Sequence, residues 1–219
     1  AAAGLAAFDL QSNGAGFADV DNDGDPDLYV LTVGLAGDPM NGRFHLFVND
    51  GTGHFTEEAV ARGADVASSH PRGGFSVAFV DYDRDGSVDL YTTEWRSTFG
   101  SGVLPHSRLL RNRGAAAPGH FEDVTVTAGV EIDRDPACLA GVAGCTSRSW
   151  APAFVDLDGD GWPDLPVVAD FGKSVLFWND GDGTFTDGTS AAGVGGDENG
   201  MGSAFGEVDG DGDLEWLMT

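Results

Sequence analysis

The sequence predicts an all-β fold, a partial β-propeller of about three and a half four-stranded blades with an acidic loop between strands A and B of each blade. Three observations predict this fold. A nine-residue acidic motif occurs four times in the 219 residues. Short apolar and β-branched runs flank each copy, as strands would. The chain has 34 glycines, about twice the usual share, which suits tight turns between short strands.

Each acidic motif places carboxylates at positions 1, 3, 5 and 9 of a loop and glycine at position 6. The four copies, called loops 1 to 4, span residues 19–27, 81–89, 156–164 and 207–215. Their carboxylates are Asp19, Asp21, Asp23 and Asp27; Asp81, Asp83, Asp85 and Asp89; Asp156, Asp158, Asp160 and Asp164; and Glu207, Asp209, Asp211 and Glu215. The two Glu residues, with their longer side chains, set loop 4 apart from the others.

Carboxylates at this spacing repel one another unless a cation lies between them. An all-oxygen shell of flexible geometry suits Ca²⁺ better than Mg²⁺, which prefers a smaller and stricter octahedron. A backbone carbonyl at position 7 would complete each shell, from Asp25, Ser87, Trp162 and Asp213. We therefore expect calcium at three to four loops. The alternative is that the loops are acidic turns that bind no metal. It is less favoured, because all four copies have the same carboxylate spacing.

The loops do not fit an EF-hand, the other common acidic calcium loop. An EF-hand loop has twelve positions, ends in a bidentate Glu and lies between helices. Position 12 is occupied here by Val30, Thr92, Val167 and Met218. The flanking runs are strand-like, so each loop is expected to join two strands.

The strands follow in the same order in each unit. Unit 1 is expected to have strands near 15–19, 27–33, 44–49 and 54–56, and unit 2 near 77–80, 90–93, 108–112 and 120–124. Unit 3 should have strands near 153–155, 165–168, 175–179 and 185, and unit 4 near 204–206 and 214–217. Asn-Asp-Gly between apolar runs, as at 49–51, is a strong hairpin signal. Three and a half blades do not close a propeller, so we expect residues 1–219 to be one segment of a larger propeller.

Composition narrows the possible partners. The net charge is −25, from 36 acidic and 11 basic residues, which argues against nucleic acid and anionic membranes. No run of eighteen apolar residues occurs, so membrane insertion is not expected. Cys138 and Cys145 form either a small disulfide, if the protein is exported, or two free thiols.

The chain resembles the FG-GAP/VCBS repeats of integrin α-subunit heads and of bacterial secreted proteins. Within these it is most similar to the cartilage-acidic-protein-like group associated with ASPIC/UnbV tails. The motifs that carry the resemblance are DVDNDGDPDLYV and LFVNDGTGHFTEEAVARGA, repeated as DLDGDGWPDLPVV and LFWNDGDGTFTDGTSAAGV. The resemblance implies a calcium-stabilised propeller in which the four loops hold the metal.

Hairpin geometry suggests where a ligand would bind. Alternating hairpins place the A–B loops and C–D turns on one face of the disc, and the B–C and D–A connections on the other. The second face varies most, near 95–107 and 127–149. We therefore expect a protein or glycan ligand on the face opposite the calcium loops. The expected function is adhesion or ligand binding in the extracellular space, at the cell surface or in the periplasm, with calcium structural.

The sequence leaves two other functions open. A lectin-like carbohydrate binder is the main alternative. A part of a polysaccharide-acting enzyme is a weaker one, because no catalytic motif is present and His70 beside Arg72 is the only candidate base. Seven of the eleven basic residues gather in and near unit 2: Arg62, Arg72, Arg84, Arg96, Arg108, Arg111 and Arg113. They either form a pocket for an acidic sugar or carboxylate with Trp95, His70 and His106, or balance neighbouring acids, the reading we favour.

Overall fold

The computed structural model describes residues 3–5, 10–34, 42–65, 73–95, 107–132, 148–170, 174–196 and 199–219. Blade 1 contains β1 (Ser12–Ala18), β2 (Asp27–Thr32), β3 (Phe44–Asn49) and β4 (Phe55–Glu57). Blade 2 contains β5 (Gly74–Val80), β6 (Asp89–Glu94), β7 (Arg108–Asn112), the 3₁₀ turn η1 (Gly114–Ala116) and β8 (Phe121–Asp123). Blade 3 contains β9 (Arg148–Pro152), β10 (Leu165–Asp170), β11 (Val175–Asn179) and β12 (Phe185–Asp187). The fourth sheet contains β13 (Ser203–Gly206) and β14 (Glu215–Met218).

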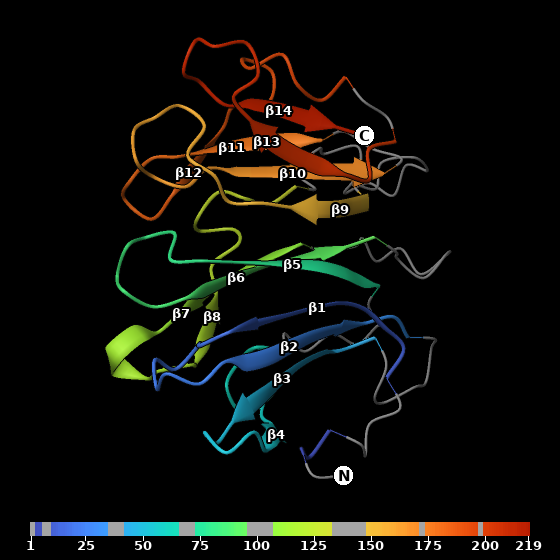
Figure 1. The fold of residues 1–219 in the computed structure, drawn as a ribbon, viewed down its shortest axis with the longest axis vertical. Helices are drawn as coiled ribbons and strands as arrows, with labels where there is room; N and C mark the ends of the chain where they lie inside the picture. The colour runs from blue at the N-terminus through green and yellow to red at the C-terminus, as the bar shows by residue number, and fades with distance from the viewer. Residues whose placement is uncertain are drawn as a thin grey trace.

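Each sheet is an antiparallel meander in which strands adjacent in sequence are also paired. The sheets stack one on another from β1–β4 at one end to β13–β14 at the other, and the loops between strands A and B lie along one side of the stack (Figure 1). The first strands are neighbours across the stack, β1 beside β5 and β5 beside β9. Three four-stranded sheets and one hairpin confirm the predicted partial propeller of three and a half blades.

The hydrophobic cores lie between blades. Large side chains of β2 and β3 pack against strands of blade 2, and side chains of blade 2 pack in turn against blade 3. The first core contains Tyr29, Leu31, Phe44, Leu46, Leu90, Leu110 and Phe121, and the second contains Tyr82, Tyr91, Leu109, Leu165, Val167, Phe177 and Phe185. Because a blade inside the stack is covered on both faces, every residue of β6 and β10 is buried.

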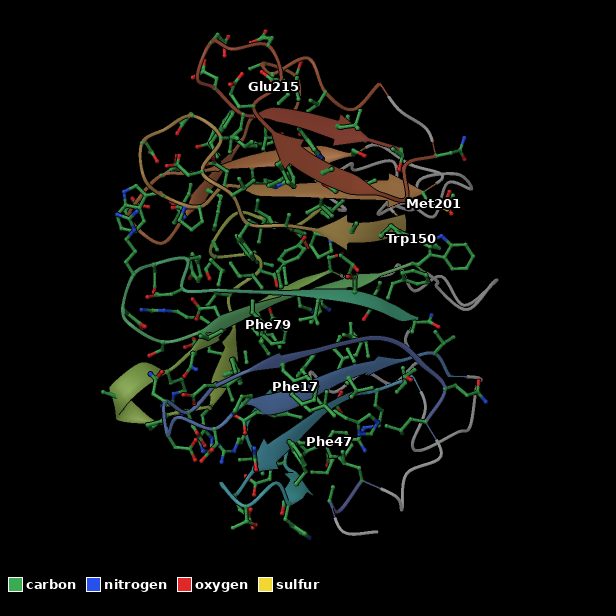
Figure 2. All side chains as sticks on the ribbon, viewed as in Figure 1. Phe17, Phe47, Phe79, Trp150, Met201 and Glu215 are labelled. Carbon is green, nitrogen blue, oxygen red and sulfur yellow. The ribbon has the colours of Figure 1, made fainter. Side chains whose placement is uncertain are left out.

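One repeated phenylalanine shows how each blade packs on the preceding one. Phe79 of β5 packs against the core between blades 1 and 2, and its ring contacts blade 1 so closely that a Cβ added to Gly16 would lie 2.5 Å from it. Phe154 occupies the corresponding place against blade 2. Phe17, the equivalent residue in blade 1, is 62% exposed. Figure 2 shows Phe79 between the first two sheets.

Most strand boundaries lie within three residues of the predicted ones, but the prediction for the first strand of unit 3 was wrong. That strand was expected near 153–155, whereas β9 ends at Pro152 and Val155 forms only an isolated bridge with Asp164. β1 begins three residues earlier than expected, whereas β3, β7 and β11 match the expected ranges. Among the described residues, no helix has the length and apolar character needed to cross a bilayer. Several predictions fall outside the described residues, namely those on Cys138, Cys145, His70, Arg72, Arg96 and His106.

Candidate metal centres

The four acidic loops join strands β1 to β2, β5 to β6, β9 to β10, and β13 to β14. Position 6 has a left-handed backbone in every loop, with φ of 95° at Gly24, 90° at Gly86, 93° at Gly161 and 96° at Gly212. This conformation strongly favours glycine, and it produces the predicted bend. Position 4 is also left-handed, at Asn22, Arg84, Gly159 and Gly210. That second bend was not predicted, although two of the four residues at this position are glycine.

The first carboxylate of each loop closes the bend by accepting backbone N–H groups. Asp19 accepts from Asp23 (3.1 Å) and Gly24 (2.9 Å), and Asp81 accepts from Asp85 (2.9 Å) and Gly86 (3.0 Å). Asp156 accepts from Gly159 (2.8 Å) and Gly161 (2.9 Å). The turn is therefore held in shape by its own carboxylates, with further oxygen lone pairs left for a cation.

The ninth carboxylate clamps the loop to strand C of the same blade. Asp27 accepts from the backbone of Val20 (3.1 Å) and Asn49 (2.8 Å), and Asp89 accepts from Tyr82 (3.1 Å) and Asn112 (2.7 Å). Asp164 accepts from Leu157 (2.9 Å) and Asn179 (3.0 Å). These three Asp residues are at most 1% exposed. A buried carboxylate at this position therefore links loop, strand and core.

Burial changes the ionisation of these three groups in the metal-free protein. Desolvation raises the pKa of Asp27 to about 6, that of Asp164 to about 6 and that of Asp89 to about 8. Nearby loop carboxylates raise the pKa further, while the backbone N–H donors lower it. A bound divalent cation would favour the ionised form of all three.

The metal-free protein is therefore expected to lose stability as the pH rises. A carboxyl whose pKa is raised in the folded state binds its proton more tightly there than in the unfolded state. Its contribution to the free energy of unfolding is complete at a pH below the unfolded-state pKa, and it is lost as the pH rises past the folded-state pKa. In chelator, the melting temperature should fall between pH 5 and pH 8. Calcium, which needs the ionised groups, should stabilise the protein more at pH 8 than at pH 5. A flat or rising profile in chelator would contradict this assignment.

The carboxylates converge in all four loops. In each loop three carboxylate oxygens lie within 4.8 Å of one another. The clusters are Asp19, Asp21 and Asp27; Asp81, Asp83 and Asp85; Asp156, Asp158 and Asp164; and Glu207, Asp209 and Asp211. Oxygens bound to one Ca²⁺ at about 2.3–2.6 Å are separated by no more than about 5 Å, so each cluster has the right size for this ion.

The clusters differ in which predicted ligands they include. Position 9 belongs to the clusters of loops 1 and 3, whereas position 5 belongs to those of loops 2 and 4. In all four loops the carboxylate at position 5 accepts the backbone N–H two residues later, at 2.7–3.0 Å, so this bond does not distinguish the clusters. Asp89 and Glu215 lie outside the clusters of their loops.

Loop 4 is the most open of the four. All three clustered carboxylates are exposed, and Glu207 accepts from Asp209 and Gly210 instead of from positions 5 and 6. The donor at position 4 is shared with loop 3, where Asp156 accepts from Gly159, whereas among the described residues loop 4 has no hydrogen bond from position 6 to its first carboxylate. Glu215 accepts from Val208 at 2.7 Å, and the fourth sheet has no third strand among the described residues to supply a second donor.

The C–D turns lie against position 7 of the loops, as hairpin geometry predicts. A Cβ added to Gly51 would lie 2.7 Å from the Asp25 carboxylate, and one added to Gly181 would lie 2.8 Å from the Trp162 indole. Gly114 is similarly close to Ser87, at 3.2 Å. The A–B loops and C–D turns therefore share one face.

An asparagine at the end of strand C is a site residue that the sequence analysis missed. The Asn112 amide donates to Val88 of its own blade (3.0 Å) and to Val20 of blade 1 (2.7 Å). The Asn179 amide donates to Pro163 (3.1 Å) and to Tyr82 of blade 2 (3.0 Å). Its recurrence in LFVND, LLRNR and LFWND was the available signal, which we took only as a hairpin signature.

The Asn112→Ala substitution is expected to destabilise the protein by about 2–4 kcal/mol, because it leaves buried carbonyls of two blades without a donor. Asn49→Ala is the matched control. Asn49 is the equivalent residue of blade 1, and among the described residues its amide donates only to Pro26, at 3.2 Å. Urea unfolding of both variants should show the larger loss for Asn112. Equal losses would contradict the link between blades.

Three of the seven arginines lie beside acids, as the favoured reading expects, whereas Arg84 contacts an aromatic ring. Arg62 lies 3.2 Å from Asp21 and 2.7 Å from Glu58, and Arg108 lies 3.0 Å from Asp123. Arg111 lies 2.6 Å from Asp83 and 3.7 Å from Asp85. Arg84 stacks on Trp162 of the next loop at 4.3 Å, and Trp95 donates to Asp170 at 2.8 Å.

Antiparallel blades with inter-blade cores and an acidic loop at each first hairpin define a β-propeller-type repeat protein. Residues 19–92 and 156–218, more than half of the chain, match the family model described as FG-GAP-like repeat. The chain belongs to this family, as its loop motifs predicted.

Relatives include cartilage acidic protein 1 of Mus musculus, Homo sapiens and Xenopus tropicalis, at 36%, 34% and 41% identity over 87 residues. These 87 residues are 40% of this chain and 12% of each relative. The similarity therefore covers a small part of the length of each relative.

Proposed function

We propose that the protein is an extracellular calcium-binding propeller module for adhesion or ligand binding, in which calcium acts structurally. The observation that carries the proposal is the convergence of three carboxylate oxygens within 4.8 Å in each of four equivalent loops. In each of loops 1 to 3, the buried carboxylate at position 9 also connects the loop to strand C of its blade. A cation bound there would stabilise the attachment of loop to blade.

Each loop would use carboxylates at positions 1, 3, 5 and 9 and the carbonyl at position 7. The described clusters supply three of these groups per loop, and the remaining carboxylate and carbonyl bring the number to five. Because Ca²⁺ takes six to eight oxygens, a bidentate carboxylate or water would complete the shell. When bound, calcium supplies positive charge that offsets the repulsion between the carboxylates. The protein's own residues hold the turn and bury its ninth position.

The ligand of the module would be a protein or a glycan on the face opposite the loops. The support is that the loop face repeats the same geometry in each blade, whereas the connections of the other face vary in length and sequence. The proposed role is not catalytic, in keeping with the typical use of FG-GAP-like repeats as binding modules. An extracellular location suits calcium-dependent folding, and the relatives carry cartilage in their name.

The proposal is tested by measuring bound metal after equilibrium dialysis against calcium in excess magnesium. We expect about three to four calcium ions per chain, retained over magnesium because the loops offer a flexible all-oxygen shell. A triple variant, Asp19→Asn, Asp81→Asn and Asp156→Asn, should lose all but the ion of loop 4. The control, Asp50→Asn with Asp182→Asn, neutralises exposed acids of the C–D turns and should keep the full number. Equal binding by the triple variant and the control would overturn the proposal.

A further inference from the structure

Loop 2 differs from the other loops because one guanidinium contacts two of its clustered carboxylates. Nε of Arg111, on β7, lies 2.6 Å from Oδ2 of Asp83, and Nη2 lies 3.7 Å from Oδ2 of Asp85. Both carboxylates belong to the cluster within 4.8 Å that Asp81 completes. A permanent positive charge therefore lies beside two of the three clustered carboxylates that calcium would use.

The repeats show that this arrangement is particular to loop 2. The residue before the asparagine that ends strand C is Arg111 in blade 2, but Val48 in blade 1 and Trp178 in blade 3. In loop 1, Arg62 contacts only Asp21, at 3.2 Å, and shares its guanidinium with Glu58. Within the described ranges, no ion pair reaches the carboxylates of loop 3. The Arg84 guanidinium lies beside loop 3, stacked on Trp162 at 4.3 Å, but it is not ion-paired with the carboxylates of that loop. Among the described residues, ion pairing to the loop carboxylates is therefore greatest at loop 2 and absent at loops 3 and 4.

The surroundings of Arg111 leave the side chain room to move. Its side chain is 45% exposed, whereas that of Asp83 is 10% exposed. Arg111 and Asp83 line a cavity of about 460 Å³ between blades 2 and 3, together with Tyr82, Thr127 and Thr184. The guanidinium can therefore leave the carboxylates without disturbing a packed core.

We propose that Arg111 is the resident counter-cation of loop 2, for which Ca²⁺ must compete, so that loop 2 keeps its fold without metal and binds calcium more weakly than loop 3. The inference rests on the proposed calcium function of the loops. In the metal-free state the guanidinium relieves the repulsion between Asp83 and Asp85. Calcium can bind the Asp83 and Asp85 oxygens only if this ion pair is broken. The free energy lost with the ion pair therefore weakens calcium binding. A positive charge remaining nearby lowers the affinity further.

The test is a calcium titration followed by ¹H–¹⁵N NMR. Gly24, Gly86 and Gly161 are suitable reporters, because each donates its N–H to the first carboxylate of its own loop at 2.9–3.0 Å. In the wild-type chain, the Gly161 signal should saturate at lower calcium than the Gly86 signal. In Arg111→Gln, the calcium midpoint at Gly86 should fall by about tenfold, the value of one hydrogen bond to a charged group. The midpoints at Gly24 and Gly161 should not change.

Two further variants keep the result interpretable. Arg111→Lys retains the charge and should stay within about threefold of the wild-type midpoint, since only the fork geometry is lost. Arg108→Gln removes an equivalent ion pair from the same strand, with Asp123 at 3.0 Å, and should change none of the three midpoints. An unchanged or raised Gly86 midpoint in Arg111→Gln, while Gly24 and Gly161 respond normally, would overturn this inference alone. No response at any of the three glycines would overturn the proposed function as well.

Discussion

Removal of calcium is expected to lower the melting temperature of the protein by about 15–30 °C. A ligand at 100 times its Kd stabilises the folded state by about 2.7 kcal/mol per site, so three sites contribute about 8 kcal/mol. In a chain of this size, 1 kcal/mol corresponds to about 2–4 °C. The physical source is the repulsion among the four carboxylates at positions 1, 3, 5 and 9 of each loop. In loop 3 no described ion pair reaches these carboxylates to relieve it.

The measurement is thermal unfolding by circular dichroism with calcium, with magnesium, and with chelator, all at one ionic strength. Constant salt is essential because a net charge of −25 makes the fold respond to screening alone. Magnesium at the calcium concentration should restore less than half of the shift. Superimposable melts in calcium and in chelator would mean that the loops are acidic turns without a metal role.

The Asp164→Ala substitution is expected to be the most damaging single change in the loops, at about 5 kcal/mol in calcium. Asp164 accepts the backbone N–H groups of Leu157 and Asn179 and is 1% exposed. Two buried donors without an acceptor account for about 2 kcal/mol, after allowance for the relief of a buried charge. Loss of the calcium of loop 3 accounts for about 3 kcal/mol more.

Glu215→Ala is the matched control, because Glu215 is the ninth residue of loop 4 and accepts from a single exposed N–H group, that of Val208. Its substitution should cost less than about 1 kcal/mol. Denaturant unfolding with and without calcium separates the two contributions at Asp164. Equal losses for the two variants, or a loss at Asp164 that does not depend on calcium, would contradict the role assigned to the buried ninth carboxylate.

The fold was predictable because each blade repeats its signals. Short apolar runs predicted the bounds of β3, β7 and β11, helped by turn residues such as the Asn-Asp-Gly after Val48. The first strand was harder to bound, because β1 begins in Ser12-Asn13-Gly14, a sequence more typical of a turn. Pairing with β2, including the irregular register between Ser12 and Gly14, extends it there.

The candidate sites were predictable at the level of the loop but not at the level of contacts between blades. Spacing alone located the glycine bends and the clustered carboxylates. It could not show that Asp89 is buried, or that Arg111 reaches loop 2, because both depend on how strand C packs beside the loop. Likewise, the bond from Asn112 to Val20 joins residues 92 positions apart. Such contacts depend on how the blades stack. The sequence repeat predicts that the blades stack, but it does not predict which atoms come into contact.

The central claim, that the loops hold calcium through the named carboxylates, is tested most directly by crystals grown in calcium and measured for anomalous scattering. We expect a calcium peak in each of loops 1, 2 and 3, with carboxylate oxygens of positions 1 and 3 at about 2.3–2.6 Å. The carbonyls of Asp25, Ser87 and Trp162 should complete the shells. Loops without anomalous peaks at saturating calcium, or peaks held by other residues, would contradict it.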